Sequence, residues 1–298
     1  MKLDNLLIEA AKIRGNTVAV ASAEDEEVIE AVVEAINRDL AHFLLFGNRE
    51  EIEELLIKKG CNKEYVKIIH TRTKEQAAQQ AVKSVHENEA SVLMKGHIST
   101  ATLLKAVLNK EYGLRMGRVL SHVAVFDIPD FPKVQIVTDA AMNIAPDLNQ
   151  KEQIINNSVE IARAIGIKKP NVAVITAVET VNPSMQATVD AAALTLMNKR
   201  GQIKNCVIDG PLGLDNAISL EAAKIKGINS DVAGQSDILF VPSLETGNVL
   251  YKSLIYFAKA KVGAVIAGAK APIVLTSRSD TAESKLYSLA LALCSTEK

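Results

Sequence analysis

The sequence predicts an α/β protein whose sheets are mainly parallel and are covered by helices. Short apolar runs with the length of strands alternate with segments of helical periodicity along almost all of its 298 residues. The chain is 48% hydrophobic and 23% charged, which is ordinary for a globular protein, and its length is sufficient for a large core in two lobes.

The first part of the chain shows this alternation without interruption. The helices expected there cover 2–14, 25–38, 49–59, 74–87 and 99–109, and the strands are Thr17–Ala21, His42–Phe46, Val66–Ile69 and Ser91–Met94. Each strand is followed by a helix long enough to return across the sheet, so the strands should run parallel.

The alternation breaks after Tyr112. Two strand-like runs, Arg118–Phe126 and Lys133–Thr138, are separated only by D-I-P-D-F-P, which is too short for a crossover helix. These two strands should therefore pair antiparallel and begin a second lobe.

Alternation then resumes to the end of the chain. The later helices are expected at 150–165, 184–199, 216–226, 247–260 and after 283, and the later strands at Asn171–Thr176, Asn205–Asp209, Asp237–Val241, Gly263–Ala267 and 273–275.

Composition excludes several classes of function. With 34 basic and 35 acidic residues and no tryptophan, the chain has neither the basic excess of a nucleic-acid binder nor the aromatic residues for base stacking. Three scattered cysteines indicate reduced thiols in the cytoplasm, and no spacing typical of a metal site occurs. The N-terminus predicts an amphipathic helix rather than a signal peptide, and no apolar run approaches the length of a membrane span.

Five polar turns follow expected strands, where open α/β sheets bind their ligands. In the first, M-K-G-H-I-S-T, Lys95 supplies a cation, Gly96 permits close backbone approach, and Ser99 and Thr100 can cap the next helix. A plain capped turn explains the same residues, and His97 is expected to be a solvated turn residue.

The next three turns offer similar alternatives. Asn182 before Pro183 predicts a helix start, and Asp209 with Gly210 forms the end of a strand and a loop that can pass close to a ligand. The run Thr246, Gly247 and Asn248 is expected to open a helix and present backbone N–H groups to an anion.

The last turn, T-S-R-S-D, joins the strand at 273–275 to the final helix. Ser277 and Arg278 could bind a phosphate or an oxyanion at the helix N-terminus. The spacing of Asp280 and Glu283 equally predicts a capping box, in which both carboxylates have structural roles.

Three classes of function are compatible with these residues. They are an enzyme acting on a phosphate-bearing or acyl substrate in a cleft between the lobes, a two-lobed small-molecule binding protein, and a nicotinamide dehydrogenase. The last is the weakest because neither GxGxxG nor GxxxxGK[ST] occurs. Ser121 and His122 cannot form a nucleophile–base pair, because neighbouring strand residues point to opposite faces.

Three motifs resemble the phosphate acetyltransferase/butyryltransferase family, and most closely its butyryltransferase branch. They are I-D-G-P-L-G-L-D-N-A at 208–217, V-P-S-L-E-T-G-N-V-L-Y-K at 241–252 and A-P-I-V-L-T-S-R-S-D at 271–280. The resemblance implies a two-lobed, three-layer αβα fold similar to isocitrate and isopropylmalate dehydrogenases, usually dimeric or larger. The lobes would be 1–112 with 263–298, and 113–262, with the active site in the cleft between them.

The resemblance also implies an activity, which is butanoyl-CoA + phosphate = butanoyl phosphate + CoA, without a metal or permanently bound cofactor. Acetyl-CoA as the substrate, or a non-catalytic acyl-CoA- or phosphate-binding member of the family, remain alternatives. Ser277 would donate to the transition state and Arg278 would hold phosphate or CoA.

The general base is where the sequence departs from the family. The acetyltransferase branch has an aspartate six residues after the arginine, and Ser284 stands there. Glu283 or Asp280 could replace it, or the reaction could depend mainly on positioning of the reactants. The further residues expected to bind substrate, CoA or phosphate are Lys95, Gly96, Ser99, Thr100, Asn182, Asp209, Gly210, Thr246, Gly247 and Asn248.

Overall fold

The computed structural model describes residues 2–275 and 280–296, which form two compact units. The N-terminal unit lies within 2–118 and 262–298, and the central unit is 119–261.

The strands are β1 (Thr17–Ala21), β2 (His42–Gly47), β3 (Val66–His70), β4 (Val92–Lys95), β5 (Ser121–Asp127), β6 (Gln135–Thr138), β7 (Asn171–Ile175), β8 (Val207–Leu212), β9 (Ile238–Phe240), β10 (Lys261–Ala267) and β11 (Ile273–Val274). The α-helices are α1 (Leu3–Lys12), α2 (Glu26–Asn37), α3 (Arg49–Lys58), α4 (Lys74–His86), α5 (Thr100–Val107), α6 (Leu148–Ala164), α7 (Gln186–Lys199), α8 (Leu214–Ile218), α9 (Leu220–Ile225), α10 (Leu244–Tyr256) and α11 (Ala282–Cys294), with a short 3₁₀ helix at Lys63–Tyr65.

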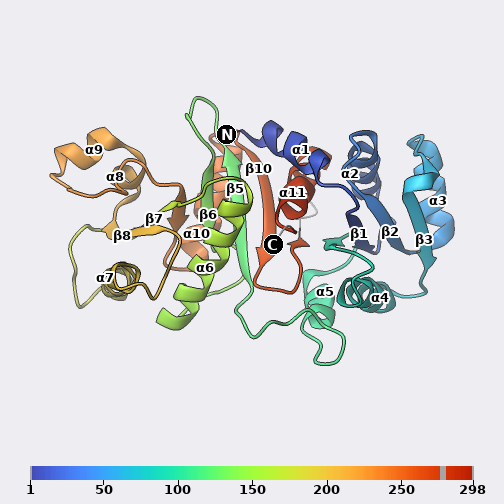
Figure 1. Ribbon diagram of the computed structural model, residues 1–298, viewed down its shortest axis with the longest axis horizontal. Coiled ribbons are helices and arrows are strands. Elements are labelled where there is room, and N and C mark those ends of the chain that lie inside the picture. Colours follow the sequence, from blue (N-terminus) through green and yellow to red (C-terminus); the bar gives the residue numbers. More distant parts are fainter. Residues whose placement is uncertain (1, 276–279, 297–298) are drawn as a thin grey trace. The chain divides into compact units, whose positions relative to one another are not determined.

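The N-terminal unit contains strands in the order β3-β2-β1-β4-β11-β10, which are parallel except that β10 runs antiparallel to β11. Helices α1, α11, α2 and α3 pack side by side on one face, and α4 and α5 pack together on the other (Figure 1). Every residue of α11 from Lys285 to Cys294 is buried, because α1 and α2 flank this helix.

The central unit contains strands in the order β5-β6-β9-β7-β8. The antiparallel pairing predicted from the short link is confirmed between β5 and β6, and the other neighbours are parallel. Ser121 of β5 accepts a hydrogen bond from Asn157 of α6, whereas the ring of His122 lies 5.7 Å from that of Tyr251 in α10. Since neighbouring strand residues face opposite ways, α6 and α10 cover opposite faces, and Ser121 and His122 do not pair.

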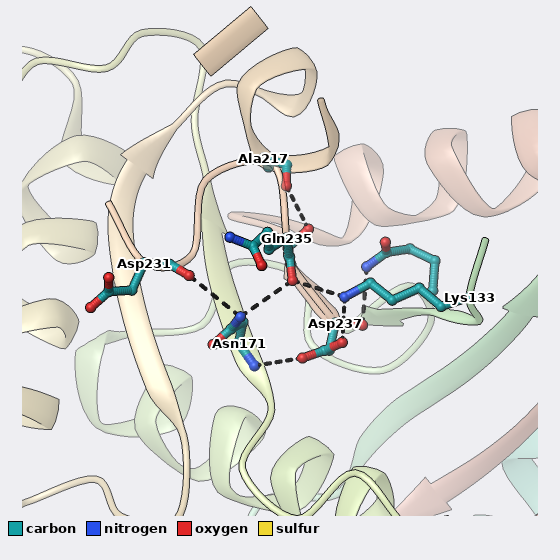
Figure 2. A network of polar contacts seen from close by, with 8 residues as sticks. Lys133, Asn171, Ala217, Asp231, Gln235 and Asp237 are labelled. Carbon is teal, nitrogen blue, oxygen red and sulfur yellow. Dashed lines mark hydrogen bonds and ion pairs between the residues drawn. The ribbon is translucent and has the colours of Figure 1, made fainter. Parts of the chain in front are cut away.

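A polar cluster ties the amino ends of β6, β7 and β9 together (Figure 2). Lys133 Nζ donates to Asp237 Oδ1 (2.5 Å) and to the carbonyl of Gln235 (2.8 Å). Asp237 Oδ2 also accepts from the backbone N–H of Asn171 (2.8 Å), so both carboxylate oxygens are used. This cluster aligns the strands at the edge opposite the expected ligand-binding turns.

One helix and one strand of the central unit differ from the sequence prediction in more than their exact ends. The helix expected at 216–226 is divided into α8 and α9, because Ser219 leaves the helical conformation and caps α9 by accepting from Ala222 N–H. Strand β8 starts at Val207 and continues through Gly210 and Pro211, so Asp209 does not end it. The proline is tolerated because β8 lies at the edge of its sheet, where one row of N–H groups needs no strand partner.

No α-helix within the described ranges combines the length and the apolar character that crossing a bilayer requires.

Candidate active site

The carboxyl ends of β1, β4 and β11 lie at one edge of the N-terminal unit, because these strands are adjacent and parallel. Lys95 is the last residue of β4 and pairs with Ala21 of β1. Its side chain is only 6% exposed, and Nζ donates to the carbonyl of Gly96 at 3.3 Å. A buried ammonium group is stabilised by an anion, so Lys95 suits this edge for phosphate chemistry.

Gly96 makes a close backbone contact with the turn after β1. Its N–H donates to the carbonyl of Ala21 at 2.9 Å, and a Cβ at this position would lie 1.9 Å from the carbonyl oxygen of Ser22. No larger residue fits there, so the glycine is required for packing of one chain segment on another.

The sequence-based search missed two polar residues at this edge, Ser22 and Glu24. Ser22 has a φ of 59° and is completely buried, and its hydroxyl has no hydrogen-bond partner among the described residues. Glu24 Oε2 is also buried without such a partner and lies against Gly47, where a Cβ would be 1.9 Å away. The polar run S-A-E-D directly after β1 was the available signal.

Ser99 caps α5, as the sequence predicted. Its Oγ accepts from the N–H of Thr102 at 3.0 Å, and Thr100 is the first helical residue and is exposed. His97 is an exposed turn residue, as expected, and its Nδ1 lies 3.4 Å from Asp25 Oδ2.

The turn after β11 is described only in part, because Ser277 and Arg278 lie outside the described residues. The capping box expected from Asp280 and Glu283 is wrong. Thr281 is the N-cap of α11, and its Oγ1 accepts from the N–H of Ser284 at 3.2 Å.

The two carboxylate residues of this turn make different contacts. The carbonyl of Asp280 accepts from Lys285 Nζ, which also donates to Glu27 at 2.7 Å. Glu283 is exposed, and its Oε1 accepts from the hydroxyl of Tyr287 at 3.2 Å. Neither carboxylate is therefore the N-cap of α11.

The corresponding edge of the central unit begins with the turn after β6, which the sequence-based search also missed. Asp139 is 4% exposed, and its carboxylate accepts four hydrogen bonds. Three come from the backbone N–H groups of Ala141, Met142 and Asn143, and the fourth, at 2.6 Å, comes from Asn143 Nδ2. The carboxylate therefore holds the whole turn in one conformation.

Helix α10 packs its first turns against this loop. It starts at Leu244 with Ser243 as its N-cap, three residues before the expected start, so Thr246 and Gly247 lie inside the helix. A Cβ on Gly247 would be 2.6 Å from the carbonyl oxygen of Asp139. Asn248 Nδ2 lies 3.4 Å from the carbonyl of Ala140, whereas Thr246 is exposed.

The turns after β7 and β8 are joined by a charged cluster. Glu179 Oε1 accepts from Asn216 Nδ2 (2.7 Å) and from Lys226 Nζ (2.6 Å), and Lys226 also lies 2.9 Å from Asp215 Oδ2. The hydrogen bonds from Lys226 hold the pKa of Glu179 and that of Asp215 below their ordinary values. The hydrogen bond to Glu179, and after it the one to Asp215, raises the pKa of Lys226.

Three predicted residues of these turns occupy positions other than expected. Asn182 does not cap α7, which starts at Gln186; its Oδ1 instead accepts from the N–H of Ser184 (2.9 Å) in a local turn. Asp209 and Gly210 lie within β8 rather than in a loop, and Asp209 Oδ1 accepts from the N–H of Gly210.

Comparison with known proteins agrees with the resemblance seen in the motifs. The family model described as Phosphate acetyl/butaryl transferase matches residues 58–293. The chain is 57% identical over 298 residues to a probable phosphate butyryltransferase of Bacillus subtilis (strain 168), covering 100% of this chain and 99% of the relative. It is 48% identical over 289 residues to a phosphate butyryltransferase of Clostridium beijerinckii, covering 97% and 96%.

A solved structure agrees as well. The crystal structure of a branched-chain phosphotransacylase from Enterococcus faecalis V583 superposes with a TM-score of 0.85 at 37% identity, covering 95% of this chain and 99% of that one. The chain belongs to the phosphate acetyl/butyryl transferase family, and the relationship predicted from its motifs is confirmed.

Proposed function

We propose that the chain catalyses reversible acyl transfer between coenzyme A and inorganic phosphate, with butanoyl-CoA + phosphate giving butanoyl phosphate + CoA. The observation that carries this proposal is 57% identity across the whole chain to a relative named as a probable phosphate butyryltransferase. The buried ammonium of Lys95 at the carboxyl edge of the N-terminal unit supports an anionic substrate. Coenzyme A and phosphate enter as substrates, and no permanently bound cofactor is part of the proposal.

In the direction of thiolysis, the sulfur of coenzyme A attacks the carbonyl carbon of the acyl phosphate while the thiol proton passes to a base. The carbon–oxygen bond to phosphate then breaks, and inorganic phosphate leaves. We infer that Ser277 donates a hydrogen bond to the developing oxyanion and that Arg278 neutralises phosphate. Lys95 supplies a second positive charge, and Ser99 and Thr100 present the first turn of α5 beside it.

In the central unit, the first turn of α10 is the proposed contact with coenzyme A. Thr246 is exposed there, and Gly247 and Asn248 hold the helix against the rigid turn formed around Asp139. Asn182, Asp209 and Gly210 shape the adjoining turns of this unit.

Asp280 and Glu283 are the two candidate general bases. Thr281, rather than either carboxylate, caps α11, and Glu283 accepts a hydrogen bond from Tyr287, which also donates to Asp4 of α1. Asp280→Asn and Glu283→Gln, measured separately, should show which carboxylate accepts the thiol proton. If both change turnover by no more than a few-fold, the turn contains no base and the reaction depends on positioning.

The test is release of free thiol from butanoyl-CoA with and without phosphate, followed with a thiol reagent. Acetyl-, isobutyryl- and valeryl-CoA are tested in the same way, because one methylene changes the discrimination between two acyl substrates by only about 1–3 kcal/mol. If no acyl-CoA shows phosphate-dependent thiol release, the chain is a non-catalytic binding member of the family. Arg278→Ala should reduce release far more than it reduces stability, and an equal loss of both would make Arg278 a structural residue.

The remaining parts of the proposal concern cellular setting and assembly. We propose a cytoplasmic enzyme that forms a homodimer or larger homo-oligomer, with the fold lineage of isocitrate and isopropylmalate dehydrogenases. Two α/β units with mostly parallel strands support the lineage, and three free thiols, at Cys61, Cys206 and Cys294, support a reducing compartment.

A further inference from the structure

An open groove lies at the end of the sheet in the N-terminal unit. Strand β3 is the last strand there, and α4 packs on β1 and β2, so the sheet extends beyond this helix. The floor of the groove is apolar. It consists of Leu44 and Phe46 of β2 and Ile69 of β3, which share one face because parallel pairing sets Phe46 beside Ile69. The groove has a volume of about 260 Å³, close to the lower end of the range for small-molecule sites.

Charged side chains of both signs stand around this floor. Lys67 of β3 lines the groove, and so do Glu87 and Glu89, which follow α4; all three are exposed. None of the three side chains forms an ion pair or a hydrogen bond within the described part of the chain. Lys83 of α4 also lines the groove, but its ammonium group lies over the ring of Tyr112, 5.3 Å from the ring centre. The groove therefore offers one uncommitted cation and two uncommitted carboxylates.

The groove is separate from the candidate active site. Its lining includes none of the turns that follow β1, β4 and β11 at the carboxyl edge. A second hollow, of about 390 Å³, adjoins it at Lys67 and Glu89, which line both. That hollow lies at the amino ends of the strands, beside Thr17 and the stacked rings of His42 and Tyr65, whose centres are 5.0 Å apart. A ligand held here would leave the carboxyl edge open.

We propose that this groove binds an α-amino acid with an apolar side chain, in its zwitterionic form. The carboxylate of the amino acid pairs with the ammonium group of Lys67, and its ammonium group pairs with the carboxylates of Glu87 and Glu89. The apolar side chain lies on the floor formed by β2 and β3, and it removes that floor from water.

Ligands with a single charge fit the groove less well. Phosphate, acyl phosphates and coenzyme A are anions, so Glu87 and Glu89 repel them and stay unpaired. A cation that carries no acid group leaves Lys67 unpaired in the same way. A zwitterion satisfies both signs of charge, and an apolar side chain distinguishes leucine from glycine or alanine. Because the groove is open and its charged groups are exposed, each ion pair is weak, and the Kd for leucine should be on the order of 1 mM.

The test is isothermal titration calorimetry of the full chain with leucine and with three related compounds. Leucinamide lacks the carboxylate, isocaproate lacks the ammonium group, and alanine lacks most of the apolar side chain. Each should bind about 10-fold more weakly than leucine, because each loses one of the three contacts. This comparison uses the unaltered chain, so it does not depend on the folding of any variant. Leucine binding is also independent of acyl transfer, so either activity can be absent without affecting the test of the other.

Substitutions assign each charged group of leucine to its partner. Lys67→Met should weaken leucine about 10-fold and leave leucinamide unchanged, since leucinamide has no carboxylate to lose a partner. The double variant E87Q/E89Q should weaken leucine similarly and leave isocaproate no weaker than before. The matched control is Lys63→Met, an exposed lysine of the 3₁₀ helix that lines neither hollow, and it should leave every Kd unchanged.

Two results would overturn the proposal. One is the absence of saturable leucine binding up to the solubility limit of leucine. The other is binding in which leucinamide and isocaproate match leucine, or in which Lys67→Met has no more effect than Lys63→Met. Thermal melting by circular dichroism verifies that each variant is folded.

Discussion

Replacing Gly96 with alanine should force apart the carboxyl ends of β1 and β4, where Lys95 lies. The added Cβ would be 1.9 Å from the carbonyl oxygen of Ser22, 2.7 Å from its carbonyl carbon and 2.8 Å from the carbonyl oxygen of Ala21. Real Cβ atoms do not approach other atoms closer than 3.0 Å, so the backbone must move by at least 3.0 − 1.9 = 1.1 Å. All three obstructing atoms belong to the main chain, which cannot rotate away as a side chain can.

The expected losses follow from this displacement. Overpacking of this kind costs about 1–3 kcal/mol, which for a chain of this size lowers the melting temperature by roughly 2–12 °C. Turnover should fall further than stability does, by about 100-fold, because a displacement of about 1 Å misplaces the reacting groups. Melting followed by circular dichroism, and phosphate-dependent thiol release at a temperature where the variant is fully folded, measure the two effects separately.

Gly113→Ala is the matched control. Its Cβ would lie 2.2 Å from the carbonyl oxygen of Asn109 and 2.5 Å from that of Val107, which is a similar clash at the far end of α5. This variant should lose comparable stability and keep its turnover. The reasoning is refuted if Gly96→Ala retains full turnover when folded, or if Gly113→Ala loses as much.

Three other substitutions or modifications test individual contacts. Thr281→Ala removes the N-cap of α11 and should destabilise the protein by about 0.5–2 kcal/mol, which lowers the melting temperature measured by circular dichroism. All four partners of the Asp139 carboxylate are N–H donors, so in Asp139→Asn the new NH2 group faces donors and loses these hydrogen bonds. The free energy of unfolding, measured by urea titration, should therefore fall by about 1–3 kcal/mol. Burial raises the pKa of Cys206 to about 11, so iodoacetamide should modify Cys206 more slowly than Cys61 at pH 8. The rate at which Cys206 is modified should keep rising as the pH approaches 11. Equal rates for the two thiols at pH 8 would contradict this reasoning.

Strands and their pairing were the part of the fold that local sequence determined best. β1 has the predicted bounds, and the antiparallel pairing of β5 with β6 followed from a link too short for a crossover. These predictions succeed because a buried strand must be apolar and because the length of a connection limits its geometry.

Helix starts were harder to predict, because several residues near each start can act as caps. At α11 both Asp280 and Thr281 are candidates, and at α10 both Ser243 and Thr246 are. Asn182 has the right chemistry for α7 but forms a tighter turn of its own with Ser184. The choice depends on how the preceding loop packs, which is a tertiary property.

The site residues that were missed are distinguished by their burial, their contacts and their backbone conformation, which composition does not reveal. Asp139 follows a strand, as the search rule required, but the turn A-A-M-N after it shows no charge or glycine pattern. Ser22 becomes notable only through its burial and its positive φ. Sequence alone could place both in turns after strands but could not distinguish them from other polar turn residues.

Gly96 was predicted to permit close backbone approach and Gly247 to present its N–H group to an anion, but both glycines have a different explanation in the structure. Gly96 presses on the carbonyl of Ser22, and Gly247 presses on the carbonyl of Asp139. In each unit a glycine thus brings two turns of the carboxyl edge into contact, beside a buried charged side chain, Lys95 in one case and Asp139 in the other. The glycines are needed to build each edge, so they are not evidence for ligand binding by themselves. The case for a phosphate site therefore depends on the family relationship and on the positive charges proposed for it, Lys95 and Arg278, rather than on the glycines.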